Sequence, residues 1–298
     1  MNYALQIMTH LGESKNFSQV LLVAGAPPVE KTGSQFHIVI NVVLSPDDIR
    51  DTLSFFASHV RRSGPVDTGG HGVFAFGMPK LGRFKVHFLT QRGSLFVSIQ
   101  RMAFDIPTLE SLLSQPGRLT LVDDALSQTG GGIVMFTGPS ADTSTRLLYA
   151  SLARVNETRS MVIYVLEQNL SFLLRHRNSV VIQVDVGTDI SSLAEGIQDS
   201  MFLTPDLLYV RDPKTPTEYA KLMCAAEAGT LVLISVVTPN EQHMLDDLKN
   251  RMPDNFKSLI RLIRKTIRVS PDRNGMIVLK EAEPLGASGP SRPLGQKV

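Results

Sequence analysis

Cysteine is almost absent from this chain of 298 residues, which contains Cys224 alone. A single thiol excludes an intramolecular disulfide framework and a metal site built from several cysteines, and it fits a reducing compartment. An excess of charge of one sign is also absent, because 30 Lys and Arg residues face 28 Asp and Glu residues. This balance argues against a chain built mainly to neutralise nucleic-acid phosphates, so we expect no nucleic-acid partner.

Long hydrophobic runs and the common catalytic or metal motifs are missing as well. No apolar run reaches the roughly 18 residues that span a bilayer, and the N-terminus lacks the basic start and unbroken apolar core of a secretory signal. The seven histidines include no close pair at metal-ligand spacing, and no Gly-x-Ser-x-Gly pattern marks a serine nucleophile. With 43% hydrophobic residues the chain can bury a sizeable core. We expect a soluble, cytoplasmic protein of about two domains.

The first hundred residues have the pattern of an α+β domain. Ser45 followed by Pro46 and two acids predicts the start of a helix that runs to residue 60. The other predicted elements are a helix at 2–12 and strands at 19–25, 36–44, 72–78, 82–91 and 94–102. Glycine-rich turns separate the last three strands, which predicts an antiparallel meander.

From residue 130 the pattern changes to strands rich in Val, Ile and Leu that alternate with helices. The predicted strands lie at 132–138, 161–167, 179–187, 206–212 and 230–238, and the predicted helices at 144–156, 190–202, 217–228, 240–250 and 254–266. Such alternation predicts a parallel sheet covered on both faces. The predicted organisation is an N-terminal domain at 1–104, a linker at 105–128, an α/β domain at 129–285 and a disordered tail at 286–298.

The segment 132–152 has the order strand, tight turn, helix that a phosphate-binding loop needs. The P-loop pattern asks for Gly, four residues, Gly, Lys and then Ser or Thr. Gly138 fits the first position, but Thr143 replaces the second Gly and Ser144 replaces the Lys. The candidate nucleotide contacts are Gly138, Ser140, Thr143, Ser144 and Thr145, with Thr145 at the position of the magnesium ligand. An ordinary strand–turn–helix connection of an α/β protein, without a nucleotide, explains the same residues as well.

Nearly the whole chain, from about residue 4 to 283, resembles the type II/IV secretion ATPase superfamily, most closely the pilus-retraction ATPases of twitching motility. The segments that carry the resemblance are QVLLVAGAPP (19–28), GRFKVHFLTQRGSLFVSIQRM (82–102), GGGIVMFTGPS (130–140), VIQVDVGTD (181–189), TPDLLYV (204–210) and CAAEAGTLVLISVVT (224–238). The resemblance implies a PAS-like α+β domain, a RecA-like P-loop NTPase core and assembly as a six-fold ring. For the superfamily it implies ATP or ADP with Mg²⁺ as cofactor, and for this chain it leaves open whether any cofactor binds.

The residues that carry the chemistry of the superfamily are largely replaced. In the acidic box Glu167 retains the first carboxylate, whereas Gln168 and Ser171 replace the other two. Glu167 could still act as a general base on a water about 3 Å away. Asp212 stands where the superfamily has a Glu that acts on magnesium and water, and Val237 stands in place of a histidine. Thr230 likewise replaces the first histidine of that motif.

Three arginines lie in the strands that, in the superfamily, direct arginines at the nucleotide of the neighbouring subunit: Arg83, Arg92 and Arg101. They are candidate nucleotide contacts, and an exposed face of an antiparallel sheet explains them equally well. A second basic segment, 255–269, combines an apolar stripe with five cations and predicts either a surface for an anionic membrane or acidic partner, or a core-packed helix with a solvated face.

The resemblance and the replaced residues together predict a pseudo-ATPase. It would be a structural or regulatory subunit of pilus or secretion machinery, in a hexameric ring of its own or a mixed ring with an active paralogue. Inner-membrane platform proteins are the expected partners, with a location in the cytoplasm or peripheral to the inner membrane. Two alternatives are an active retraction motor with atypical Walker motifs, and a monomeric adaptor without nucleotide.

Overall fold

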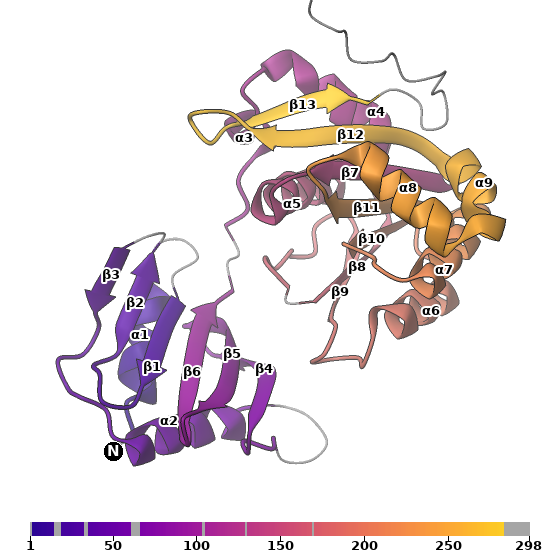
Figure 1. Ribbon diagram of the computed structural model, residues 1–298. Helices are drawn as coiled ribbons and strands as arrows, with labels where there is room; N and C mark the ends of the chain where they lie inside the picture. The colour runs from indigo at the N-terminus through magenta and orange to yellow at the C-terminus, as the bar shows by residue number, and fades with distance from the viewer. Residues whose placement is uncertain are drawn as a thin grey trace, which may run out of the picture. The chain divides into compact units, whose positions relative to one another are not determined.

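The computed structural model describes residues 2–14, 19–32, 35–60, 66–102, 105–128, 130–168 and 170–282 (Figure 1). The chain divides into two compact units, 1–104 and 105–298, apart from 171–173, which are grouped with the first. The predicted tail, 286–298, lies outside the described residues. Among the helices in the described ranges, none is long and apolar enough to cross a membrane.

The first unit is a six-stranded antiparallel sheet with two helices on one face. Its elements are α1 (Ala4–Glu13), β1 (Gln19–Val23), β2 (Val29–Thr32), β3 (Gln35–Ile38), α2 (Pro46–Ser58), β4 (His71–Met78), β5 (Gly82–Gln91) and β6 (Ser94–Arg101). The strand order is β3-β2-β1-β6-β5-β4. Buried residues of α1 and α2, such as Leu11 and Phe56, join Phe84 and Ile99 of the strands in one core.

The predicted helix start and meander are confirmed. Ser45 caps α2 in a capping box with Asp48. β5 and β6 are joined by the two-residue turn Arg92-Gly93, in which both residues have positive φ, as a tight hairpin requires. The strand predicted at 36–44 is shorter: β3 ends at Ile38, and the backbone N–H of Leu44 turns back to the Ala26 carbonyl.

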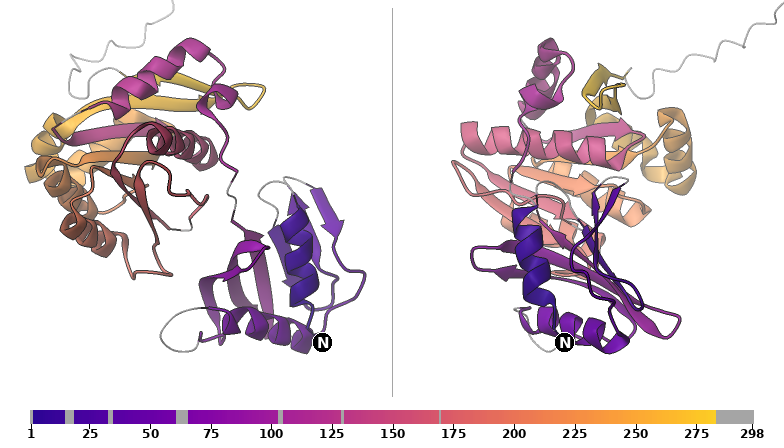
Figure 2. Two further views of the ribbon diagram at one scale, coloured as in Figure 1. Left: turned by 180° about the vertical axis from the view of Figure 1, so that it is seen from behind. Right: turned by 90° about the vertical axis from the view of Figure 1, so that its left-hand side faces the viewer.

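The second unit is a seven-stranded sheet between two layers of helices (Figure 2). Its elements are α3 (Leu109–Leu112), the 3-10 turn η1 (Pro116–Arg118), α4 (Leu119–Leu126), β7 (Gly132–Gly138), α5 (Ala141–Thr158), β8 (Val162–Glu167), β9 (Val180–Asp185), α6 (Leu193–Leu203), β10 (Leu207–Arg211), α7 (Pro216–Glu227), β11 (Leu231–Val237), α8 (Glu241–Arg251), α9 (Pro253–Leu262), β12 (Ile263–Pro271) and β13 (Ile277–Glu281). The order is β13-β12-β7-β11-β10-β8-β9, and every pair except β12–β13 is parallel. The predicted parallel sheet is therefore confirmed.

Residues 105–128, predicted as a linker, are helical and pack within the second unit. The Arg154 guanidinium on α5 binds both carboxylate oxygens of Asp123 on α4, at 3.0 and 3.2 Å, and contacts Glu110 on α3 at 3.2 Å. The backbone N–H of Ser114 donates to the Ile277 carbonyl on β13. Most apolar side chains of this stretch, such as Leu112 and Val122, are buried in the unit, which a free linker does not require.

The helix predicted at 254–266 is wrong in its second half. α9 ends at Leu262, and residues from Ile263 form β12 beside β7. Ile267 and Val269 are buried on either side of the exposed Arg268, the spacing that a β-branched segment takes when a neighbouring strand is available. The cations of this basic segment are therefore divided between a helix and a strand.

Candidate functional site

The motif positions singled out in the second unit meet at the carboxyl edge of its parallel sheet. Gly138 ends β7, Glu167 ends β8, Asp212 follows β10 and Val237 ends β11. Gly138 is paired in register with Val237. Parallel strands bring their carboxyl ends to one edge, which is where open α/β sheets bind ligands.

The segment after β7 is a short turn rather than a phosphate-binding loop. A P-loop places its eight motif residues between the strand and the helix. Here α5 begins at Ala141, so Ala141 to Thr145 are already helical. The Ser140 hydroxyl caps the helix by accepting from the Thr143 backbone N–H at 3.3 Å and from the Thr143 hydroxyl at 3.0 Å. Ser140 and Thr143 therefore use their polar atoms on each other.

The next two candidate contacts are enclosed in the protein. Ser144 is 1% exposed and Thr145 is 4% exposed, and neither hydroxyl has a hydrogen-bond partner among the described residues. A Cβ on Gly138 would lie 2.1 Å from the Val269 carbonyl oxygen of β12, so this glycine is needed for close packing. These residues do not fit a magnesium nucleotide, because residues 138–145 include no lysine to contact its phosphates and α5 already begins at Ala141.

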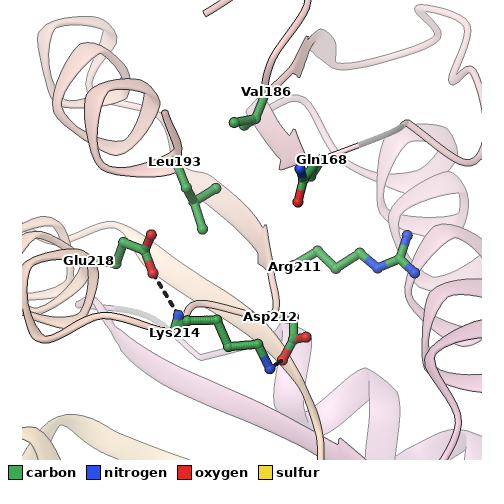
Figure 3. Close-up of a pocket in the computed structure, with 7 residues that line it drawn as sticks. All are labelled: Gln168, Val186, Leu193, Arg211, Asp212, Lys214 and Glu218. Carbon is green, nitrogen blue, oxygen red and sulfur yellow. Dashed lines mark hydrogen bonds and ion pairs between the residues drawn. The ribbon is translucent and has the colours of Figure 1, made fainter. Parts of the chain in front are cut away.

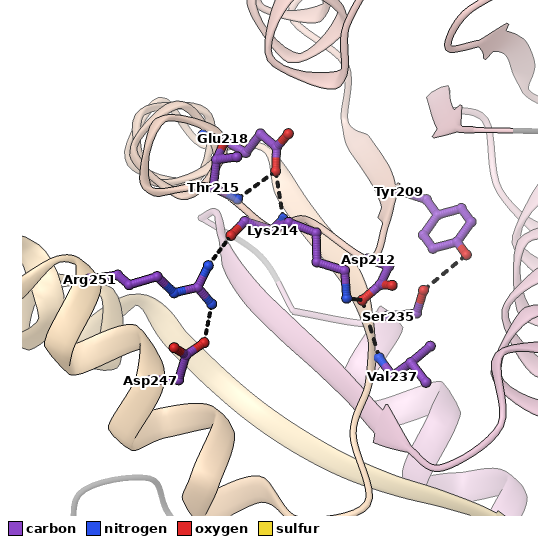
Figure 4. Close-up of polar contacts among 9 residues, drawn as sticks. All are labelled: Tyr209, Asp212, Lys214, Thr215, Glu218, Ser235, Val237, Asp247 and Arg251. Carbon is purple, nitrogen blue, oxygen red and sulfur yellow. Dashed lines mark hydrogen bonds and ion pairs between the residues drawn. The ribbon is translucent and has the colours of Figure 1, made fainter.

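Glu167 is fully buried and both of its carboxylate oxygens are occupied. Tyr149 of α5 donates to Oε2 at 2.8 Å, and Tyr209 of β10 donates to Oε1 at 3.3 Å. An Arg211 guanidinium nitrogen lies 3.7 Å from Oε1. The Tyr209 hydroxyl also contacts Ser235 of β11 at 3.2 Å (Figure 4). We call Tyr149, Glu167, Tyr209 and Arg211 the buried carboxylate cluster.

The alternation of side chains along the strands produces this cluster. Leu166, Leu208 and Ile234 lie in the core under α6–α9. Their neighbours Glu167, Tyr209 and Ser235 therefore point to the opposite face, where α5 packs against β7 and β11 and supplies Tyr149. A carboxylate buried in this way needs donors, and the two tyrosines and the arginine supply them.

Both tyrosines of the cluster have pKa values well above 10, because burial disfavours the phenolate and the Glu167 charge repels it. In the unfolded chain their pKa is about 10. Above that pH the unfolded chain releases protons that the folded protein keeps, so stability falls by about 1.4 kcal/mol per pH unit for each tyrosine. Urea denaturation between pH 8 and 11.5 checks this: Tyr149→Phe should give a shallower fall by that amount. Equal slopes in variant and wild type would contradict the burial of a neutral Tyr149.

Asp212 forms an ion pair with Lys214 in the loop after β10. Its backbone has a φ of 52°, and its Oδ1 accepts from Lys214 Nζ at 2.7 Å and from the Val237 backbone N–H at 3.3 Å (Figure 4). These contacts fix the carboxylate beside the end of β11. Thr230, the other replaced histidine position, is buried at the start of β11, and its hydroxyl donates to the Pro205 carbonyl.

A pocket of about 390 Å³ opens beside Asp212, between the starts of α6 and α7 (Figure 3). Its lining is Gln168, Val186, Leu193, Arg211, Asp212, Lys214 and Glu218. In Figure 3 the Arg211 guanidinium points away from Lys214 and Glu218. Glu167 is not part of the lining, but Arg211 belongs both to the lining and to the buried carboxylate cluster, so it lies between the pocket and Glu167.

The three candidate arginines of the first unit do not converge. Arg101 pairs in register with Phe84, on the helix-covered face, and donates to the Gly12 carbonyl of α1 at 3.0 Å. Arg83, next to Phe84 in β5, points to the opposite face. Arg92 lies in the turn at the far end of the same hairpin, about 30 Å from Arg83 along β5.

The sequence did not single out Tyr149, Tyr209 and Arg211, which complete the environment of Glu167. The available signal was a phenol hydroxyl within apolar sequence: Tyr209 lies in the strand LLYV at 207–210, and Tyr149 lies between Leu148 and Ala150. The sequence does not show that the two tyrosines contact Glu167, because Tyr149 and Tyr209 lie 18 and 42 positions away from it along the chain.

No protein-family model matches the chain. The chain is 24% identical over 239 residues to the type IV pilus ATPase PilU of Pseudomonas aeruginosa, a match that covers 80% of this chain and 61% of PilU. It is 23% identical over 218 residues to a twitching motility protein of Neisseria gonorrhoeae, covering 70% of this chain and 57% of that protein. The chain thus spans about three fifths of the length of these relatives.

The crystal structure of the pilus retraction motor PilT with bound ADP superposes with a TM-score of 0.76 at 21% identity. The match covers 94% of this chain and 82% of the PilT chain. This likeness confirms the predicted fold class, an N-terminal α+β domain followed by a RecA-like core with a parallel sheet. By sequence the chain is a homologue of type IV pilus ATPases, and by fold it is similar to the pilus retraction motor PilT.

Proposed function

We propose that this chain is a pseudo-ATPase, a relative of the retraction ATPases that keeps their scaffold and has lost efficient ATP turnover. The observation that carries the proposal is the state of Glu167. A general base must reach the proton it removes, directly or through one water. The Glu167 carboxylate is wholly buried and bonded to two tyrosines, with an arginine beside it, so it stabilises the fold instead of activating a water.

The turn after β7 supports the same proposal. Ser144 supplies no charge where a lysine would contact the β- and γ-phosphates, and Ser140 already satisfies a backbone donor at the start of α5. Losing one preorganised group costs about 3–4 kcal/mol of transition-state stabilisation. Several such losses need not add, because catalytic groups act as a unit, but little hydrolysis would survive them.

A structural or regulatory role follows for a chain that keeps the fold without the chemistry. We place it in the cytoplasm, in a hexameric ring of its own or in a mixed ring with an active paralogue, at the inner-membrane platform of a pilus or secretion machine. The support is the resemblance to the retraction ATPases and the likeness to the PilT fold.

Measuring ADP binding and the molar mass of the particle in solution distinguishes the pseudo-ATPase from the two alternatives, an active motor and a monomeric adaptor. Calorimetry with ADP and Mg²⁺ would be run beside light scattering on the same sample. We expect an oligomer with weak or absent ADP binding. An oligomer that binds ADP tightly and hydrolyses ATP would favour the active motor. A monomer that does not bind ADP would favour the adaptor, and either outcome would overturn the proposal.

A further inference from the structure

The β12–β13 hairpin carries two exposed cations opposite each other on one face. Arg268 of β12 is paired in register with Lys280 of β13, so the two side chains share a face. Like charges directly opposite each other destabilise a strand pair. We call Arg268 and Lys280 the basic hairpin face.

Nearby carboxylates neutralise this face only in part. Glu241 of α8 lies 3.2 Å from Arg268 Nε and is also bonded to the Thr137 hydroxyl. Lys280 forms no ion pair with a residue in the described ranges. Glu281 lies on the other face of the hairpin, with Lys265 Nζ at 3.5 Å. The basic hairpin face therefore keeps an excess of positive charge.

The same hairpin forms an edge of the sheet. β13 is the last strand in the order, and the Ala282 backbone N–H donates inward to the Thr266 carbonyl. Because antiparallel partners alternate, Leu279 and Glu281 direct their backbone N–H and C=O groups outward. Ser114 covers this edge at Ile277. Beyond it, no described residue is bonded to the outward groups of Leu279 and Glu281.

We propose that the β12–β13 hairpin binds an extended acidic segment of a partner protein. The segment pairs with the outer edge of β13 and places carboxylates against Lys280 and Arg268. Strand addition supplies the backbone hydrogen bonds, and charge-assisted bonds to the cations select an acidic sequence. A bilayer offers no strand, and residues 253–282 expose no large hydrophobic side chain that could insert into one. The inference does not rest on the loss of ATP hydrolysis.

The experiment uses the full chain and a labelled ten-residue peptide of alternating Glu and Val, with a Lys-Val peptide as the control. Fluorescence anisotropy should show binding of the acidic peptide only. Lys280→Glu should weaken it about tenfold or more. Arg273→Glu, at the exposed hairpin turn, makes the same change of net charge away from the face and should leave the affinity within about twofold.

A second pair of variants tests the edge itself. Glu281→Pro removes the outward N–H that strand addition would use, and proline is tolerated at an edge strand. Glu281→Ala removes the same side chain and keeps the N–H. We expect the proline variant to lose about tenfold in affinity relative to the alanine variant, with an unchanged circular dichroism spectrum.

Three outcomes would overturn the proposal. One is no binding of the acidic peptide, and another is equal weakening by Lys280→Glu and Arg273→Glu. The third is equal affinity of the Glu281→Pro and Glu281→Ala variants. Vesicles with anionic lipid serve as a separate arm: binding that depends on Lys280, without peptide binding, would assign the face to a membrane surface.

Discussion

Gly138→Ala is expected to lower the free energy of unfolding of the second unit by about 3 kcal/mol or more. The added Cβ would lie 2.1 Å from the backbone carbonyl oxygen of Val269. That oxygen belongs to β12, whose Val269 side chain is buried, so the clash can be relieved only by moving a strand out of the core. Urea denaturation of the full chain, followed by circular dichroism, measures the loss.

Gly117→Ala is the matched control in the same unit. A Cβ there would meet no atom within 4 Å, and Gly117 does not have a positive φ. The change should stay within about 0.5 kcal/mol. Equal stability of the Gly138→Ala and Gly117→Ala variants would contradict the packing role of Gly138 and would favour a glycine kept for the approach of a phosphate.

Glu167→Ala is expected to cost about 3 kcal/mol of stability. It removes the acceptor for the Tyr149 and Tyr209 hydroxyls and the anion beside Arg211. Arg211 is a quarter exposed, so water reduces its share of the loss. Thermal and urea denaturation should both show the effect.

Glu167→Gln separates the hydrogen bonds of the cluster from its charge. The amide keeps an acceptor oxygen for one tyrosine, so the loss should be nearer 1 kcal/mol. If Glu167 were a solvated catalytic base, both variants would unfold like the wild type and would differ in turnover only.

Most of the fold could be predicted from the sequence, because strongly periodic apolar runs indicate which face of each helix or strand is buried. The strand predicted at 206–212 and the helix start predicted at Ser45 appear in the structure as β10 and as the cap of α2. The secondary-structure predictions were wrong where packing against a neighbouring element decides between helix and strand. Ile263 and Ile267 satisfy a helical period as well as a strand period, and the open edge of β7 selected the strand.

The candidate site was less readable. The positions of Gly138, Glu167 and Asp212 at one sheet edge follow from the strand pattern. The state of each residue does not: the ion pair of Asp212 with Lys214 depends on how the loop after β10 turns, and the burial of Glu167 depends on side chains from other elements. α5 starts at Ala141 because Ser140 caps it, and the sequence alone does not show that the turn before the helix is so short that Ser140 is the capping residue.

Magnesium-dependent ATP hydrolysis by the purified full chain tests the central claim most directly. We expect phosphate release no faster than the background without protein, and the same rate for wild type, Thr145→Ala and Glu167→Gln. Hydrolysis by the wild type that disappears in either variant would contradict the pseudo-ATPase account and would assign Thr145 or Glu167 to catalysis.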